Sequence, residues 1–438
     1  MRSPIPDYLT EVLDRCTAGE AGALADYIPQ LARVDPDSFG VAICTIDGQV
    51  YSAGDTDLEF TIQSISKPFT YALAVQELGL AAVLEKVDVE PSGEAYNEIS
   101  LEQESGRPRN PMINAGAIAA YSLVPARDDA QRRAKLRDFS NRIAGRDLRL
   151  DEAVLVSEEE TAFRNRAIAY LLRNAGVIDQ NPDQAVNGYS EQCSRAVTVQ
   201  DLAQMAATLA NGGVQPSTGV RVVDADAVRQ TLSVMLTCGM YDAAGDWVTT
   251  VGIPAKSGVS GGIIGVLPGQ VGIAVQSPGL DAHGNSSRGV RVFERLSADM
   301  GMHIMDPPKA TPSVLHGLYR THRVGQPGRE VTVYELQGDL RFAGAEHLVR
   351  EWAENLPPTP EVLLDVHRTG GFDDVARRMT VEGMARLARS DDKTVYLVDP
   401  AGVLGLTEDD PEAPVLLDRA GELIPDVPAD DWSSAEPE

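Results

Sequence analysis

The sequence lacks the features that would place it in a membrane or on a nucleic acid. None of its apolar runs approaches the roughly 18 to 20 residues that a membrane span needs. Positive charge is also scarce, because 38 Lys and Arg residues face 65 Asp and Glu, which gives a formal net charge of -27. Phosphate backbones and anionic membrane surfaces would repel such a chain. We therefore expect neither a nucleic acid nor a membrane as partner.

Cysteine is rare, and its spacing argues against a disulfide framework. Cys16, Cys44, Cys193 and Cys238 lie far apart and form no C-x-x-C pair, which indicates buried thiols in a reducing compartment. The first residues lack the charged and apolar blocks of an export signal. We expect a cytoplasmic protein.

Histidine is absent from the first 282 residues, since the first of the six is His283. This excludes a Ser-His-Asp triad and a zinc site of the H-E-x-x-H kind from that part of the chain. If a serine acts there as a nucleophile, a lysine or a tyrosine must move the proton.

The length of 438 residues suggests two domains, because single cores stop growing near ~250 to 300 residues. A proline-rich stretch over 304–328 predicts a linker between them. Before it, residues 39–54 alternate apolar and polar residues around Asp47-Gly48, and residues 262–278 have Pro268-Gly269 in a turn. These patterns predict two hairpins. The segment between the hairpins is mainly helical, with Thr198 and Asp201 spaced as a capping box. We expect one antiparallel sheet with a helical insert.

The stretch FTIQSISKPFTYALAVQELGL, residues 60–80, places Ser64 and Lys67 three residues apart where an amphipathic helix begins. Pro68 fits only a first helical turn, which supports that placement. Residues three apart on a helix are neighbours, and burial would lower the pKa of the lysine enough to make it a base. The alternative is an N-cap serine beside a surface lysine.

A second short motif occurs late in the domain, where Lys256-Ser257-Gly258 precedes a predicted strand. It is comparable with the K-T-G element that accompanies S-x-x-K in serine β-lactamases and penicillin-binding proteins. By itself it is equally a glycine-rich turn with an exposed lysine. The order of the two elements favours the catalytic interpretation.

Seven ordered stretches carry a resemblance to a known family: ADYIPQLA, FTIQSISKPF, NPMINAGAI, SEEETAFRNRAIAYLLRNAG, YSEQCSRAVT, MLTCGMYDAAGDW and GIPAKSGVSGGI. Over about residues 5–303 the chain resembles the serine-dependent glutaminases, which have a β-lactamase-like fold. The resemblance implies hydrolysis of L-glutamine to L-glutamate and ammonia through a glutamyl ester. It also implies no metal, no organic cofactor, and a homo-oligomer, either a dimer or a tetramer.

The same resemblance assigns the catalytic groups. Ser64 matches the nucleophile, Lys67 its partner, Tyr241 a tyrosine that exchanges protons, and Tyr189 a second tyrosine near the reacting centre. The backbone N-H groups of Ser64 and Val259 match an oxyanion hole. Whether Lys67 or Tyr241 takes the first proton stays open at this point.

The substrate pocket must hold an α-ammonium and an α-carboxylate. Glu158 matches the group that faces the ammonium, and Asn114, Asn165 and Tyr189 match those around the carboxylate. Tyr27 and Gln63 match further residues of the pocket wall. Taken singly, each has a simpler alternative as a turn residue, a helix-start acid or a half-buried core side chain. Glycines 258 and 261 are interpreted as allowing the backbone to approach the substrate.

The second domain alternates strand-like and helix-like segments, which predicts a small α/β layer. Over residues 329–404 it resembles a STAS domain, and we expect a regulatory or assembly role. Relatives carry a phosphorylatable serine at the start of the second helix, where this chain has Asp373 and Asp374, so a phosphorylation switch is not expected and a helix cap is. Residues 405–438 are predicted to form an acidic tail.

The predicted fold class is therefore a β-lactamase/penicillin-binding-protein-like α/β domain over 1–303, a linker, and a STAS-like domain. Two other functions remain as alternatives. One is a β-lactamase-like hydrolase of another amide, against which the missing export signal and the amino-acid pocket argue. The other is an inactive sensor that binds an amino acid and signals through the second domain.

Overall fold

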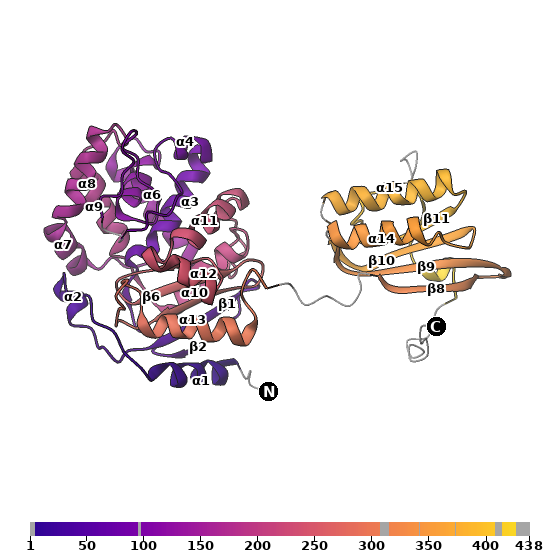
Figure 1. The fold of residues 1–438 in the computed structure, drawn as a ribbon, viewed down its shortest axis with the longest axis horizontal. Helices are drawn as coiled ribbons and strands as arrows, with labels where there is room; N and C mark the ends of the chain where they lie inside the picture. Colours follow the sequence, from indigo (N-terminus) through magenta and orange to yellow (C-terminus); the bar gives the residue numbers. More distant parts are fainter. Residues whose placement is uncertain are drawn as a thin grey trace. The chain divides into compact units, whose positions relative to one another are not determined.

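The computed structural model describes residues 5–94, 98–306, 315–340, 342–372, 374–407 and 414–425. The chain divides into two compact units, residues 1–306 and 307–438 (Figure 1). Each unit has its own sheet and its own buried core. We describe them separately.

The first unit contains an antiparallel five-stranded sheet in the order β2-β1-β7-β6-β5. Its strands are β1 (Gly40–Thr45), β2 (Val50–Gly54), β5 (Ala255–Ser257), β6 (Gly262–Leu267) and β7 (Val271–Gln276). The first and last parts of the unit thus meet in one sheet, as predicted, and both predicted hairpins are confirmed. Gly48 and Gly269 have φ values of +91° and +76° in the two turns, which suits glycine. A short ladder joins β3 (Phe60–Thr61) to β4 (Ala196–Val197).

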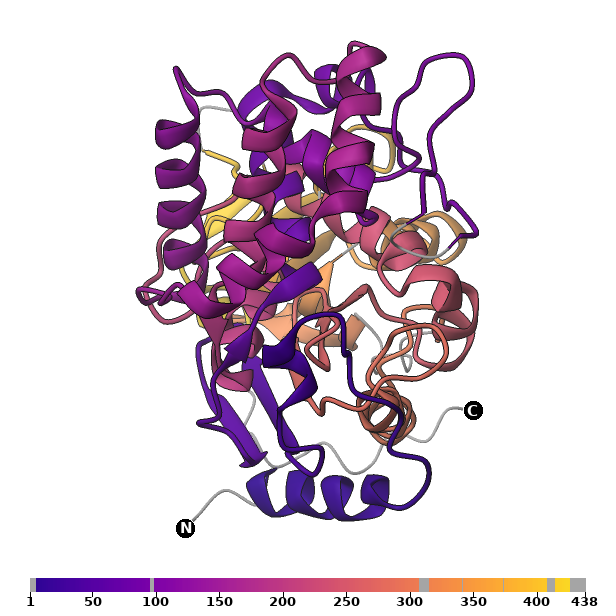
Figure 2. The same cartoon turned by 90° about the vertical axis from the view of Figure 1, so that its left-hand side faces the viewer.

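Side chains alternate along the strands and build a core on each face of the sheet. On β1, Val41 and Ile43 contact the layer of α1 and α13, whereas Ala42 and Cys44 contact the layer that contains α10. Figures 1 and 2 show the helical insert on one side of the sheet and α1 on the other. The helices are α1 (Ile5–Thr17), α2 (Pro29–Ala32), α3 (Ser66–Leu78), α4 (Leu80–Leu84), α5 (Asn114–Leu123), α6 (Asp129–Ala144), α7 (Glu152–Thr161), α8 (Phe163–Asn174), α9 (Pro182–Cys193), α10 (Val199–Ala210), α11 (Ala225–Cys238), α12 (Ala244–Thr250) and α13 (Ser287–Met300).

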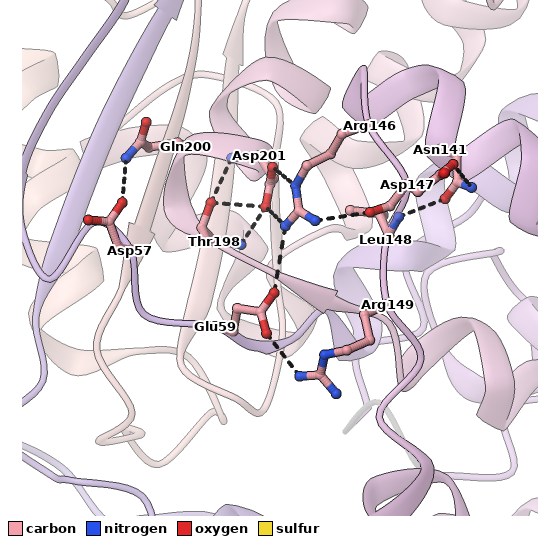
Figure 3. A network of polar contacts seen from close by, with 10 residues as sticks. All are labelled: Asp57, Glu59, Asn141, Arg146, Asp147, Leu148, Arg149, Thr198, Gln200 and Asp201. Carbon is pink, nitrogen blue, oxygen red and sulfur yellow. Dashed lines mark hydrogen bonds and ion pairs between the residues drawn. The ribbon is translucent and has the colours of Figure 1, made fainter.

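The predicted capping box at the start of α10 is confirmed. Thr198 Oγ1 accepts a hydrogen bond from the Asp201 N-H, and the Asp201 carboxylate accepts one from the Thr198 N-H. Arg146 donates from Nε and Nη2 to the same carboxylate at 2.6 Å each (Figure 3). The start of α10 is therefore fixed both by its own first turn and by Arg146, which follows α6.

The second unit is a five-stranded sheet in the order β12-β11-β10-β9-β8 with α14 and α15 on one face. Strands β9 to β12 are parallel neighbours, and β8 runs antiparallel to β9. The other face packs against a short segment that contains Leu423 and Ile424. The elements are β8 (Leu315–Arg323), β9 (Gln326–Leu340), α14 (Phe342–Glu354), β10 (Glu361–Phe372), α15 (Asp374–Ser390), β11 (Thr394–Val398), β12 (Val415–Leu417) and the 3-10 turn η3 (Ala420–Glu422).

Two predicted boundaries differ from the structure. Residues 315–328, assigned to the linker, form β8 and the start of β9, because the backbone of β8 pairs with β9 over most of its length. Residues 415–417, assigned to the acidic tail, form β12, which pairs with the buried strand β11. The rest of the predicted linker and tail lies partly outside the described residues, as does Asp373, one of the two aspartates expected to cap the second helix of this unit.

Candidate functional site

A cavity of about 240 Å³ opens between the sheet and the helical insert of the first unit. Every predicted site residue except Lys67 and Tyr241 lies in its wall. The lining residues are Tyr27, Gln63, Ser64, Asn114, Glu158, Thr161, Ala162, Arg164, Asn165, Tyr189, Ser190, Cys193 and Val259.

Ser64 lies in a short 3-10 turn, η1 (Gln63–Ile65), which leads directly into α3. The predicted helix therefore begins at Ser66, two residues later than expected. Ile65 is the N-cap of α3 and makes no side-chain cap, so Ser64 does not serve as a capping serine. Gln63 just before it has a φ of 49°, an uncommon conformation for a residue with a side chain.

Lys67, in the first turn of α3, is completely buried, which rules out the alternative of a surface lysine. Its Nζ donates to Asn114 Oδ1 at 2.7 Å and to the Met112 carbonyl at 3.2 Å. Burial removes water from the ammonium and lowers its pKa to about 7. A large share of this amine is therefore neutral near neutral pH, as a base requires.

The side chain of Asn114, on α5, makes hydrogen bonds to side chains on three other helices, α3, α8 and α9. At the start of α5, its Oδ1 accepts from Lys67 and from Tyr189 OH, the latter at 3.2 Å. Its Nδ2 donates to Asn165 Oδ1 on α8 at 3.0 Å. Burial raises the pKa of Tyr189 well above its usual value, so its phenol stays protonated. The predicted carboxylate-binding residues thus belong to one hydrogen-bonded chain.

Glu158 projects from α7 on another wall of the cavity. Its Oε1 accepts from Tyr27 OH at 2.8 Å and from Gln63 Nε2 at 3.2 Å. Burial raises the pKa of this carboxyl group, and the two hydrogen bonds oppose that rise. The cavity therefore has an acidic group on one wall and neutral amides with a phenol on another.

Tyr241 does not line the cavity but lies behind it, close to the K-S-G motif. Its OH donates to the Ser257 carbonyl at 2.9 Å, and Lys256 Nζ lies 4.0 Å from the centre of its ring. Lys256 is fully buried, which lowers its pKa well below the usual value and contradicts the alternative of an exposed lysine. Tyr241 has a φ of 58°, the second residue near the site with a left-handed backbone.

The glycines on either side of Val259, Gly258 and Gly261, also have a packing reason. A Cβ on Gly258 would lie 3.2 Å from the Ile62 carbonyl, and one on Gly261 would lie 2.2 Å from that of Ser277. Gly261 also has a φ of +86°. Packing of the turn against its neighbours is a reason for glycine at both positions, and the approach of a substrate stays a prediction.

Sequence reasoning missed five residues of the cavity wall: Thr161, Ala162, Arg164, Ser190 and Cys193. All five lie within the quoted family stretches, but no chemical signal separated them from helix surface. Burial raises the pKa of Cys193 to about 11, so this thiol is a poor nucleophile. In the described part of the chain, no three His, Cys, Asp or Glu side chains gather as metal ligands, and no helix is long and apolar enough to cross a membrane.

The chain is similar in sequence to proteins of one known family. The family model described as Glutaminase matches residues 22–305. A glutaminase of Corynebacterium glutamicum is 48% identical over 403 residues, which cover 92% of this chain and 95% of that protein. A glutaminase of Trichormus variabilis is 49% identical over 304 residues, or 69% of this chain and 91% of that protein.

The chain is also similar to solved structures. The crystal structure of a protein called Mglu superposes with a TM-score of 0.82 at 44% identity, and covers 92% of this chain and 100% of that one. A probable glutaminase from Bacillus subtilis in complex with 6-diazo-5-oxo-L-norleucine gives a TM-score of 0.63 at 33% identity, covering 70% of this chain and 98% of that one.

Proposed function

Because the chain belongs to the glutaminase family, we propose that it hydrolyses the side-chain amide of L-glutamine through an ester on Ser64. The observation that carries this proposal is one cavity lined by Ser64, Glu158 and Asn114, whose Oδ1 accepts a hydrogen bond from the buried Lys67 amine. The alternative of a β-lactamase-like hydrolase of another amide has less support, since relatives that match 92% of this chain are named as glutaminases.

In the proposed reaction Ser64 Oγ attacks the amide carbon as the neutral Lys67 amine accepts its proton. The Ser64 and Val259 N-H groups stabilise the oxyanion, an arrangement worth ~2.7 to 4 kcal/mol per donor in other enzymes. The C-N bond then breaks, and ammonia leaves with a proton returned through Lys67 or Tyr241. Water attacks the ester next and releases L-glutamate and a free serine.

Substrate selection follows from the two polar walls. Glu158 pairs with the α-ammonium, while Asn165, Asn114 and Tyr189 bind the α-carboxylate; Tyr27 and Gln63 hold Glu158 in place. Because both ends of the amino acid are fixed, an amide one methylene shorter does not reach Ser64. Asparagine is therefore a poor substrate.

A diazoketone analogue tests the nucleophile directly. We expect 6-diazo-5-oxo-L-norleucine to inactivate the enzyme, losing N2 and taking up one proton as its terminal carbon bonds to Ser64 Oγ. Peptide mass mapping should find the adduct within residues 60–80. Cys193 lines the same cavity and serves as the internal control. An adduct on Cys193 with Ser64 unmodified contradicts the proposal.

We further propose that the second unit is a STAS-like module that regulates or assembles the enzyme. Its support is the parallel β9–β10–β11 arrangement with α14 and α15 on one face. We propose a cytoplasmic homo-oligomer, for which Phe163 (77% exposed) and Tyr170 (54% exposed) on α8 offer an apolar contact surface.

Removing the second unit tests this role. A chain ending at Asp306 should fold and keep its glutaminase activity, because the first unit has its own cores. Light scattering should then show a different number of subunits. A chain ending at residue 328 is the control, since it leaves β8 without its partner strand and should aggregate. If the shorter chain folds but does not turn over glutamine, the proposed division of labour is wrong.

A further inference from the structure

A second cavity, of about 600 Å³, lies in the first unit next to the site described above. Its volume falls within the ~300 to 1,000 Å³ of small-molecule sites. Its wall comes from α2 and the segment after it, the end of β2, the loop from β2 to β3, β3 itself and the start of α7. Ser260, in the turn before β6, and Gln276, at the end of β7, complete it. None of its residues belongs to the proposed catalytic set.

The rim of this cavity is acidic. Asp35, Asp55, Asp57, Glu59 and Asp151 line it, and no lysine or arginine does. Glu59 is neutralised by Arg149 at 2.9 Å (Figure 3). Among the described residues, the other four carboxylates form no ion pair, and each accepts only a hydrogen bond from a neutral group, such as Gln200 Nε2 at Asp57. The cavity therefore favours a cation.

The floor of the cavity supplies the second observation. Ser260 and Gln276 line it and are 6% and 3% exposed, yet Ser260 Oγ and Gln276 Oε1 have no hydrogen-bond partner in the part of the chain that the structure describes. Gln30 Oε1, on the same wall, is also buried without a partner. Buried polar atoms normally have a hydrogen-bond partner, and leaving one without a partner is unfavourable. N-H or O-H donors of a ligand are the groups that such oxygens bind.

The arrangement does not suit a metal ion. Metal sites bring three or more carboxylate or imidazole groups to one point, and the described residues contain no such cluster. Here the carboxylates are distributed around a wide rim, with neutral acceptors below. We propose that this cavity is a second ligand site, which binds a small organic cation with two or more amino groups.

The site has a direct connection to the catalytic cavity. Ile28, Leu31, Val154 and Val259 form one apolar cluster, in which Leu31 and Val154 line the large cavity and Val259 the catalytic one. Thr61, on the wall of the large cavity, accepts a hydrogen bond from Gln63 at 3.2 Å. A ligand bound here contacts the elements that carry Val259 and Gln63.

Calorimetry with 1,4-diaminobutane as the probe tests the proposal on the full chain at low ionic strength. We expect one binding event, which saturating L-glutamate does not abolish. The double variant Asp55→Asn/Asp57→Asn should raise the Kd at least ~10-fold, since two charge-assisted hydrogen bonds are lost. Asparagine keeps an oxygen for the Phe39 N-H and for Gln200, so the fold should persist. Ser260→Ala should also weaken binding.

Two controls make the outcome decisive. Asp138→Asn/Asp226→Asn removes the same charge from exposed positions outside the cavity and should leave the Kd unchanged. Glu158→Gln should also leave it unchanged, because Glu158 lines the other cavity. The proposal is overturned if the diamine does not bind, if 1,4-butanediol or Mg²⁺ binds equally well, if the distant variant weakens binding as much, or if Glu158→Gln abolishes it.

Discussion

Replacing Ser64 with alanine should lower kcat by about 10⁴-fold or more, the loss seen when a covalent nucleophile is removed from other hydrolases. The cavity loses only one hydroxyl, while Glu158 and the Asn114 chain keep their places. L-Glutamine should therefore still bind, with a Kd close to the wild-type value. Ammonia release and isothermal calorimetry measure the two quantities separately.

Ser66→Ala is the matched control for this experiment. Its hydroxyl is also buried at the start of α3, but it donates to the Gln63 carbonyl and does not line the cavity. Its loss of kcat should be far smaller. A Ser64→Ala enzyme with wild-type kcat would refute the ester mechanism. A wild-type protein that binds glutamine and releases no ammonia would instead be an amino-acid sensor.

Lys67→Met should lower kcat by about 10² to 10⁴-fold, the range for loss of a general base. In the wild type, kcat/KM should rise as pH increases through about 7, because the buried amine loses its proton there. The variant should lack this limb. Lys67→Arg is the control that keeps the charge but does not deprotonate, and it should be equally impaired. A limb near pH 7 that persists in Lys67→Met assigns the titration to another group.

The same pKa makes a prediction about stability, and its sign can be stated. Between about pH 7 and the ordinary lysine pKa of 10.5, the unfolded chain holds a proton on Lys67 that the folded chain does not. The free energy of unfolding therefore rises with pH in that window, by up to ~1.4 kcal/mol per unit. Comparing denaturant curves of wild type and Lys67→Met across this window isolates the contribution.

The elements that could be predicted from the sequence are those marked by a pattern of neighbouring residues. Alternation and turn glycines gave both hairpins of the first sheet, and the Thr198–Asp201 spacing gave the cap of α10. The resemblance named residues that the fold brings from η1, α5, α7, α8 and α9 to one cavity. Their roles still await the experiments above.

What sequence reasoning missed depends on tertiary contacts. β8 was not predicted because its residues are mostly polar and half-buried or exposed, and the backbone pairing with β9 makes it a strand. The burial of Lys256 under Tyr241 follows from how the two segments meet. The acidic cavity is formed by residues from 30 to 276, whose proximity no local pattern reports.

The left-handed backbones of Gln63 and Tyr241 have a consequence for engineering. A non-glycine residue in the left-handed region typically lowers the free energy of unfolding by about 1–3 kcal/mol. These two residues therefore reduce the thermal stability of the first unit. Glycine at position 63 would relax the chain but remove the amide that holds Thr61 and Glu158. A screen for thermostable mutants should therefore repeatedly recover poorly active enzymes at these two positions, and durable gains should come from elsewhere in the chain.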